Sequence, residues 1–67
     1  MPPHVAQVRA VMATRGVTQA ELANALGLSQ SAVSRRLAGS QPFRTDELDA
    51  VARFLGVALT INLAETA

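Results

Sequence analysis

The residues of this chain that can do chemistry are mainly arginines, and they are unevenly distributed. All six basic residues are arginines, five of them precede residue 46, and Glu21 is the only acid in that part. The remaining 22 residues hold four acids and Arg53. A guanidinium is a planar fork of N–H donors that fits phosphate oxygens and the edge of guanine. The pattern favours nucleic acid as a partner, although ordinary solvated surface arginines would give the same distribution.

Groups that catalyse reactions are scarce. The chain has one histidine, His4, and no cysteine, so a thiol nucleophile, a disulfide and a thiolate zinc site are all excluded. The one cluster of carboxylates, Asp46, Glu47 and Asp49, begins an amphipathic helical pattern, and no glycine-rich phosphate loop is present. We therefore expect no enzyme, and no metal, cofactor or small-molecule ligand.

Length and composition indicate one small helical domain. The 67 residues are 49% hydrophobic with a net charge of +1, and alanine and leucine predominate. The apolar stretches are far shorter than the roughly 20 residues that span a bilayer, and Met1-Pro2-Pro3 does not open a signal-peptide pattern. We expect a cytoplasmic protein with no membrane partner.

Glycines at 16, 27, 39 and 56 divide the chain into helix-length segments, near 4–15, 18–26, 29–38 and 45–55. Each segment repeats apolar residues at helical spacing. The expected buried faces are Val5, Val8, Val11 and Met12, then Leu22, Ala23 and Leu26, then Val33 and Leu37, then Leu48, Val51, Ala52 and Leu55. The predicted fold class is all-α, a compact four-helix bundle.

Residues before three of these segments are suited to capping. Thr18 and Glu21 form a capping box, and Ser29 is a favourable N-cap. We expect Thr45 to cap the fourth helix, with Asp46 in its first turn. Phe43, in the preceding loop, is expected to fold inward over the core.

The C-terminal tail allows two interpretations. Apolar and polar residues alternate over 57–63, which slightly favours a β-strand over a short fifth helix at 58–66. A lone strand would need the same strand of a second copy, at a dimer interface. The predicted domain therefore spans 1–57, and 58–67 is a tail that serves as a dimerisation segment.

The spacing around Gly27 is the most specific feature. Ala23 lies four residues before this glycine and Val33 six residues after it. Two helices that cross steeply at close range need a small residue at the crossing and a positive φ in the turn. Ala23 and Gly27 supply these, which predicts a helix-turn-helix.

The motif residues resemble the lambda-repressor and Cro class of helix-turn-helix domains. The resemblance rests on Gln19–Ala23 and Gly27–Arg35, continues through Asp46–Leu48 and Phe54–Val57, and covers roughly 4–57. It implies that the second motif helix, at about 29–38, lies in the major groove of double-stranded DNA. It further implies a phage or bacterial regulator, most simply a Cro-like repressor that binds an inverted-repeat operator as a homodimer.

The resemblance also implies DNA contacts, namely Gln19, Gln30, Ser31, Ser34, Arg35, Arg36 and Arg44. Arg35 would read guanine, Gln30 would take adenine or a phosphate, and Ser31 and Ser34 would face base edges. Gln19 and Arg44 would bind backbone phosphates. Helix capping by Gln19 and plain exposure of Ser31, Ser34 and Arg44 are the alternative roles.

Arg36 departs from the family's pattern. Its position is often a large apolar or aromatic residue, so we expect the aliphatic stem of Arg36 to pack while its head reaches a phosphate. The resemblance leaves open whether Arg36 belongs to the core or to the DNA contacts.

Two other interpretations remain open for the chain as a whole. An antitoxin of this broad class would bind DNA in the same way and capture a toxin through its tail. The 67 residues are also consistent with a fragment of a longer repressor.

Overall fold

Four helices form the described part of the chain, residues 3–57 of the computed structural model. They are α1 (Pro3–Arg15), α2 (Gln19–Leu26), α3 (Gln30–Leu37) and α4 (Thr45–Leu55). The all-α prediction is confirmed, and each helix lies within a residue or so of its expected bounds. The strand or fifth helix expected in the tail lies outside the described residues. Among residues 3–57, no helix is long and apolar enough to cross a membrane.

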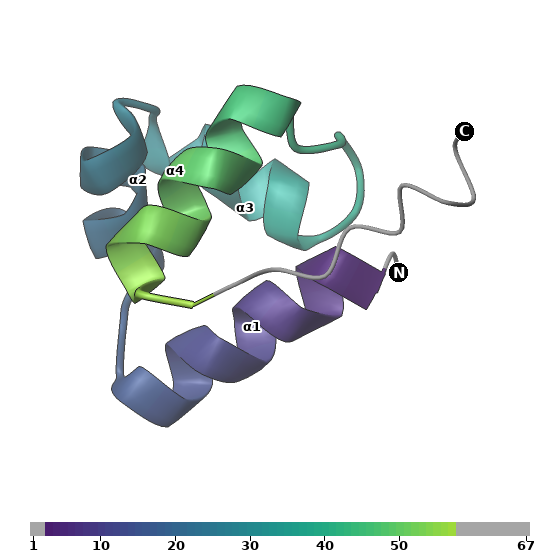
Figure 1. Cartoon of the computed structure of the whole chain (residues 1–67). Helices are drawn as coiled ribbons and strands as arrows, with labels where there is room; N and C mark the ends of the chain where they lie inside the picture. The colour runs from purple at the N-terminus through teal and green to yellow at the C-terminus, as the bar shows by residue number, and fades with distance from the viewer. Residues whose placement is uncertain (1–2, 58–67) are drawn as a thin grey trace.

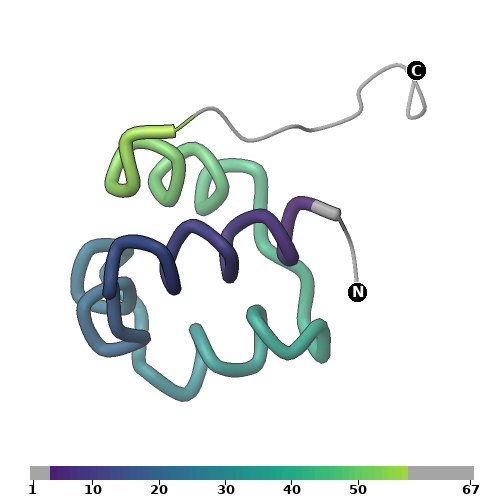
Figure 2. The backbone as a smooth tube through the Cα atoms, turned by 90° about the horizontal axis from the view of Figure 1, so that it is seen from below, coloured from purple at the N-terminus to yellow at the C-terminus, as the bar shows by residue number. Residues whose placement is uncertain are grey.

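The helices pack in two crossed sets. Helix α1 packs against α3 and α4, and α2 packs against the same two helices. Figure 1 shows α1 below α4 and α3, and Figure 2, seen from below, shows α1 in front of them, with α4 on one side, α3 on the other and α2 at one end. Helices α3 and α4 do not pack directly against each other, because no Cα atom of α3 lies within 8 Å of a Cα atom of α4.

Apolar side chains from every helix meet in one core. The buried apolar residues are Val5, Val8, Met12, Leu22, Ala23, Ala32, Val33, Leu37, Phe43, Leu48, Val51 and Leu55. Phe43 folds inward as expected, whereas Val11, Leu26 and Ala52 are only partly buried. Full burial of a valine- or leucine-sized side chain contributes about 1.5–3 kcal/mol, and this core holds α3 in place.

The turn between α2 and α3 has the expected geometry. Ala23 is only 4% exposed, which leaves room for close approach of the two helices. Gly27 ends α2 in the left-handed region, at φ 68°. The Leu28 N–H then donates to the Ala23 carbonyl at 3.0 Å. A side chain at Gly27 would be strained because L-residues rarely adopt this φ.

Two of the three expected caps are confirmed. Thr18 Oγ1 accepts from the Glu21 N–H at 3.1 Å, and the Glu21 carboxylate accepts from the Thr18 N–H at 2.9 Å. Ser29 Oγ accepts from the Ala32 N–H at 3.1 Å.

The expected cap of α4 is wrong. Thr45 is the first residue of the helix, and the N-cap position belongs to Arg44. The reason is that the Glu47 carboxylate reaches back and accepts from the Arg44 N–H at 2.9 Å. The helix therefore begins one residue earlier than a Thr45 cap would require.

Candidate nucleic-acid interface

Helix α3 has two sharply different sides. Its period of 3.6 residues places four exposed residues on one half of its circumference and four buried residues on the other. The exposed set is Gln30, Ser31, Ser34 and Arg35, and the buried set is Ala32, Val33, Arg36 and Leu37. The exposed half is polar and holds no acid, so α3 presents hydrogen-bonding groups and one cation to the outside.

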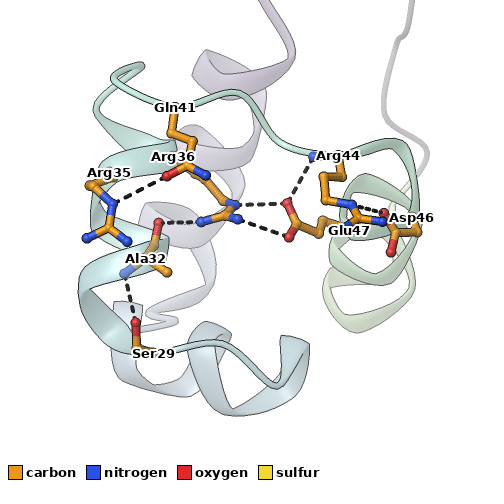
Figure 3. Close-up of polar contacts among 8 residues, drawn as sticks. All are labelled: Ser29, Ala32, Arg35, Arg36, Gln41, Arg44, Asp46 and Glu47. Atoms are coloured by element: carbon orange, nitrogen blue, oxygen red, sulfur yellow. Dashed lines mark hydrogen bonds and ion pairs between the residues drawn. The ribbon is translucent and has the colours of Figure 1, made fainter.

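Arg35 supplies that cation. Its Nε donates to Gln41 Oε1 at 3.3 Å, and within residues 3–57 the guanidinium has no acidic partner. Figure 3 shows Arg35 and Arg36 leaving α3 toward different sides. The terminal N–H groups of Arg35 are donors for a phosphate or a base edge. Gln41, which orients this guanidinium from the loop, was missed in the sequence because no periodic pattern marks it.

The smaller polar residues of α3 are also exposed. Ser31 Oγ lies 3.3 Å from Ser29 Oγ, so one hydroxyl can donate to the other. Gln30 and Ser34 make no side-chain hydrogen bond within the described part of the chain. Both side chains can therefore hydrogen-bond an external group without breaking an internal bond.

Gln19 lies half-buried at the start of α2 and is not part of the exposed half of α3. It lines an open hollow of about 310 Å³ together with Arg9, Met12, Val17, Thr18 and Leu37. Arg9, which was not among the predicted site residues, donates from Nη1 to the Leu37 carbonyl at 3.2 Å. The cation therefore lies at the C-terminal end of α3, where the helix dipole favours positive charge.

The structure gives Arg36 a different role from the predicted phosphate contact. Arg36 is 7% exposed. Its Nε and Nη2 donate to the two carboxylate oxygens of Glu47 at 2.8 and 3.2 Å, and Nη1 donates to the Ala32 carbonyl at 3.1 Å (Figure 3). A buried guanidinium with every nitrogen engaged is not available to a phosphate. The prediction is corrected: Arg36 is a paired charge in the interior, not a phosphate contact.

Glu47 is the matching anion on α4. Burial raises the pKa of its carboxyl, but the Arg36 guanidinium and the Arg44 N–H lower it by more, so the pKa lies below its usual value. Glu47 is thus a carboxylate at neutral pH. It joins the buried side of α3 to the first turn of α4.

Arg44 is exposed at the start of α4, as the prediction of a phosphate contact requires. Its Nε lies 3.2 Å from Asp46 Oδ1, and both side chains are largely exposed. Such a surface pair is weak and exchanges readily with another anion. Farther along α4, Arg53 and Asp49 pair at 3.1 Å. Each acid of α4 therefore has an arginine partner, whereas Arg35 has no acidic partner among residues 3–57.

The structure places four of the seven predicted residues on one side of α3. The four exposed residues of α3 share a surface, and Arg44 is linked to that helix through Glu47 and Arg36. Gln19 occupies a separate place on α2, and Arg36 lies behind the surface in the core.

Comparison with known proteins agrees with this geometry. A family model described as a helix-turn-helix domain matches residues 5–62. No curated protein and no solved structure matches the chain. The matched range includes all of α2, α3 and α4 and nearly all of α1.

Proposed function

Because the chain belongs to the helix-turn-helix domain family and binds DNA, we propose that it is a transcriptional regulator that recognises one operator sequence through α3. The observation that carries the proposal is the division of α3 into an acid-free polar half and a buried half. Eight residues make a helix about 12 Å long, comparable to the width of the major groove.

The proposed contacts divide into base readers and phosphate contacts. Arg35 reads guanine with its terminal N–H groups, and Gln30 reads adenine or takes a phosphate. Ser31 and Ser34 face base edges beside them. Gln19 and Arg44 hold backbone phosphates, which set the register without reading sequence. Each good base contact discriminates by about 1–3 kcal/mol.

The proposed assembly is a homodimer on an inverted repeat. Two α3 helices would enter successive major grooves, with half-site centres about 34 Å apart. The proposed DNA-binding domain spans 1–57, and residues 58–67, outside the described range, are the proposed dimerisation segment that follows it. We propose repression, as in Cro-like regulators, because occupancy of a promoter is sufficient to block transcription. Such a protein acts in the cytoplasm of a bacterial or phage-infected cell.

Selection of bound sequences from a random duplex pool tests this function. The expected result is an inverted repeat with half-sites one helical turn apart, and a band-shift titration that shows two chains per duplex. If arginines of the dimer neutralise about six phosphates, the logarithm of the binding constant should fall with the logarithm of salt concentration at a slope of about −5. A folded protein that enriches no sequence would contradict the proposal.

A further inference from the structure

Helices α3 and α4 are connected by side chains rather than by close backbone packing. Each of the two helices packs against α1 and α2, but α3 and α4 do not pack directly against each other. The Arg36–Glu47 ion pair spans the space between them, with side chains that are 8% and 11% exposed. This pair is the only ion pair between different helices in the described part of the chain.

One carboxylate oxygen serves both sides of this connection. Glu47 Oε1 accepts from Arg36 Nε at 2.8 Å and from the Arg44 N–H at 2.9 Å. Figure 3 shows Glu47 between the two arginines, reached from α3 on one side and from the start of α4 on the other. The buried side of α3 is thereby tied to the backbone of Arg44.

We propose that Arg36 and Glu47 are positioning residues for DNA binding, and that they set sequence specificity without touching DNA. The pair fixes the placement of α3 relative to Arg44. The base-reading residues of α3 and the phosphate contact Arg44 can then bind the same duplex at the same time. The inference rests on the proposed function, which assigns Arg35 and Arg44 to DNA.

Energetics favour a geometric role over a purely stabilising one. Removing two charges from water offsets much of their attraction, so an apolar pair of similar volume is often equally stable. A guanidinium and a carboxylate joined by two parallel hydrogen bonds, however, have one preferred relative orientation. An apolar side chain at position 36 would fill the space but would not fix one orientation of α3 relative to the start of α4.

The decisive variant removes both charges together. Arg36→Met/Glu47→Gln keeps an oxygen that can accept from the Arg44 N–H and avoids an unpaired buried charge. Its matched control, Arg53→Met/Asp49→Asn, removes the same charges from the exposed pair on α4. Each protein is measured for its melting temperature, for its affinity for the selected operator, and for its affinity for a random duplex.

The expected result separates specificity from stability. The Arg36→Met/Glu47→Gln variant should melt near the wild type, yet its ratio of operator to random-duplex affinity should fall about tenfold, which corresponds to one disrupted base contact. The Arg53→Met/Asp49→Asn control should keep the wild-type ratio. Arg36→Lys retains the charge without the two-bond fork, and its ratio should lie between those of the wild type and the double variant.

Two results would overturn the inference. A double variant with a wild-type ratio would show that the pair only fills the core. If the double variant unfolds, Arg36→Lys decides, because a folded Arg36→Lys protein with a wild-type ratio would also show that the fork does not set specificity. Failure of the proposed function gives a different result, because the wild type itself would then prefer no DNA sequence. In that case the proposed positioning role of Arg36 and Glu47 would be wrong as well.

Discussion

Arg35 and Arg36 are adjacent in the chain but occupy opposite environments. The Arg35 guanidinium is exposed and bonds Gln41 at 3.3 Å, whereas the Arg36 guanidinium is buried and bonds Glu47 at 2.8 Å. One step along a helix rotates a side chain by about 100°, which carries the second arginine from the solvent side to the interior. The two residues should therefore respond differently to mutation.

Arg35→Ala should reduce specificity and leave folding intact. An exposed arginine contributes little to stability, but loss of a guanine contact removes about 1–3 kcal/mol of discrimination. The ratio of affinities for the selected operator and a random duplex, measured by band shift, checks this. Arg53→Ala removes an exposed arginine from α4 and should leave the ratio unchanged. If Arg35→Ala also keeps the wild-type ratio, Arg35 does not read a base.

Asp46→Asn should tighten DNA binding. Its carboxylate lies 3.2 Å from the Arg44 guanidinium and would repel a phosphate that approaches the same cation. Exposed pairs contribute about 0.2–1 kcal/mol, so affinity should rise by up to about fivefold for operator and random duplexes alike.

The matched variant for that comparison is Asp49→Asn, one turn farther along α4, where the carboxylate pairs with Arg53 instead. Titrations at one fixed salt concentration should show no gain for Asp49→Asn. Equal gains for both variants would mean that only net charge matters and that Arg44 is not a specific contact.

Ala23→Leu should destabilise the domain and weaken DNA binding. Ala23 is 4% exposed where α2 and α3 cross, and a larger side chain would force the helices apart. Overpacking of this kind costs about 1–3 kcal/mol, measured by urea unfolding. Ala25→Leu makes the same change at an exposed position of α2 and should alter stability by less than about 0.5 kcal/mol. Equal stabilities for the two variants would contradict a tight crossing.

Glu47 should make the domain acid-sensitive. Its pKa in the folded state lies below its usual value, so its contribution to stability is complete above the unfolded pKa of about 4.3. That contribution is lost as pH falls through the folded pKa. Glu21, whose pKa is lowered by the Thr18 N–H and hydroxyl, acts in the same direction.

Unfolding free energies measured from pH 7 to pH 3 separate these two carboxyls. Glu47→Gln should be less stable than the wild type at pH 7, by roughly 3 kcal/mol, because Arg36 is left buried without its partner. The difference should shrink toward pH 3. Glu21→Gln, at an exposed capping position, should change the curve far less. A constant difference for Glu47→Gln across this range would contradict a stabilising carboxylate.

Local patterns predicted most of this fold. Helical spacing located the core, and Thr18, Ser29 and Gly27 marked helix ends, because caps and turns depend on a few adjacent residues. The α4 cap was misplaced for a reason that the sequence contains. Glu47 lies three residues after Arg44, the spacing at which a carboxylate reaches back to an N-cap N–H. The prediction placed the cap at Thr45 because threonine is a common N-cap residue.

Contacts between distant residues could not be predicted in the same way. Arg36 meets Glu47 across 11 positions, and Arg9 meets Leu37 across 28, so both depend on how the helices are placed. A charged residue next to an apparent DNA contact looks like a second contact when only charge and spacing are known. Burial distinguishes the two, and burial is a property of the packed bundle.

The most direct test of the central claim is a titration of the ¹⁵N-labelled protein with its selected duplex, followed by amide chemical shifts. The account predicts that the largest changes fall on Gln30–Arg35, with smaller ones at Gln19 and Arg44. The outer side of α4, at Arg53 and Phe54, should stay nearly unchanged. Largest changes along α4, with α3 unaffected, would contradict recognition of DNA through α3.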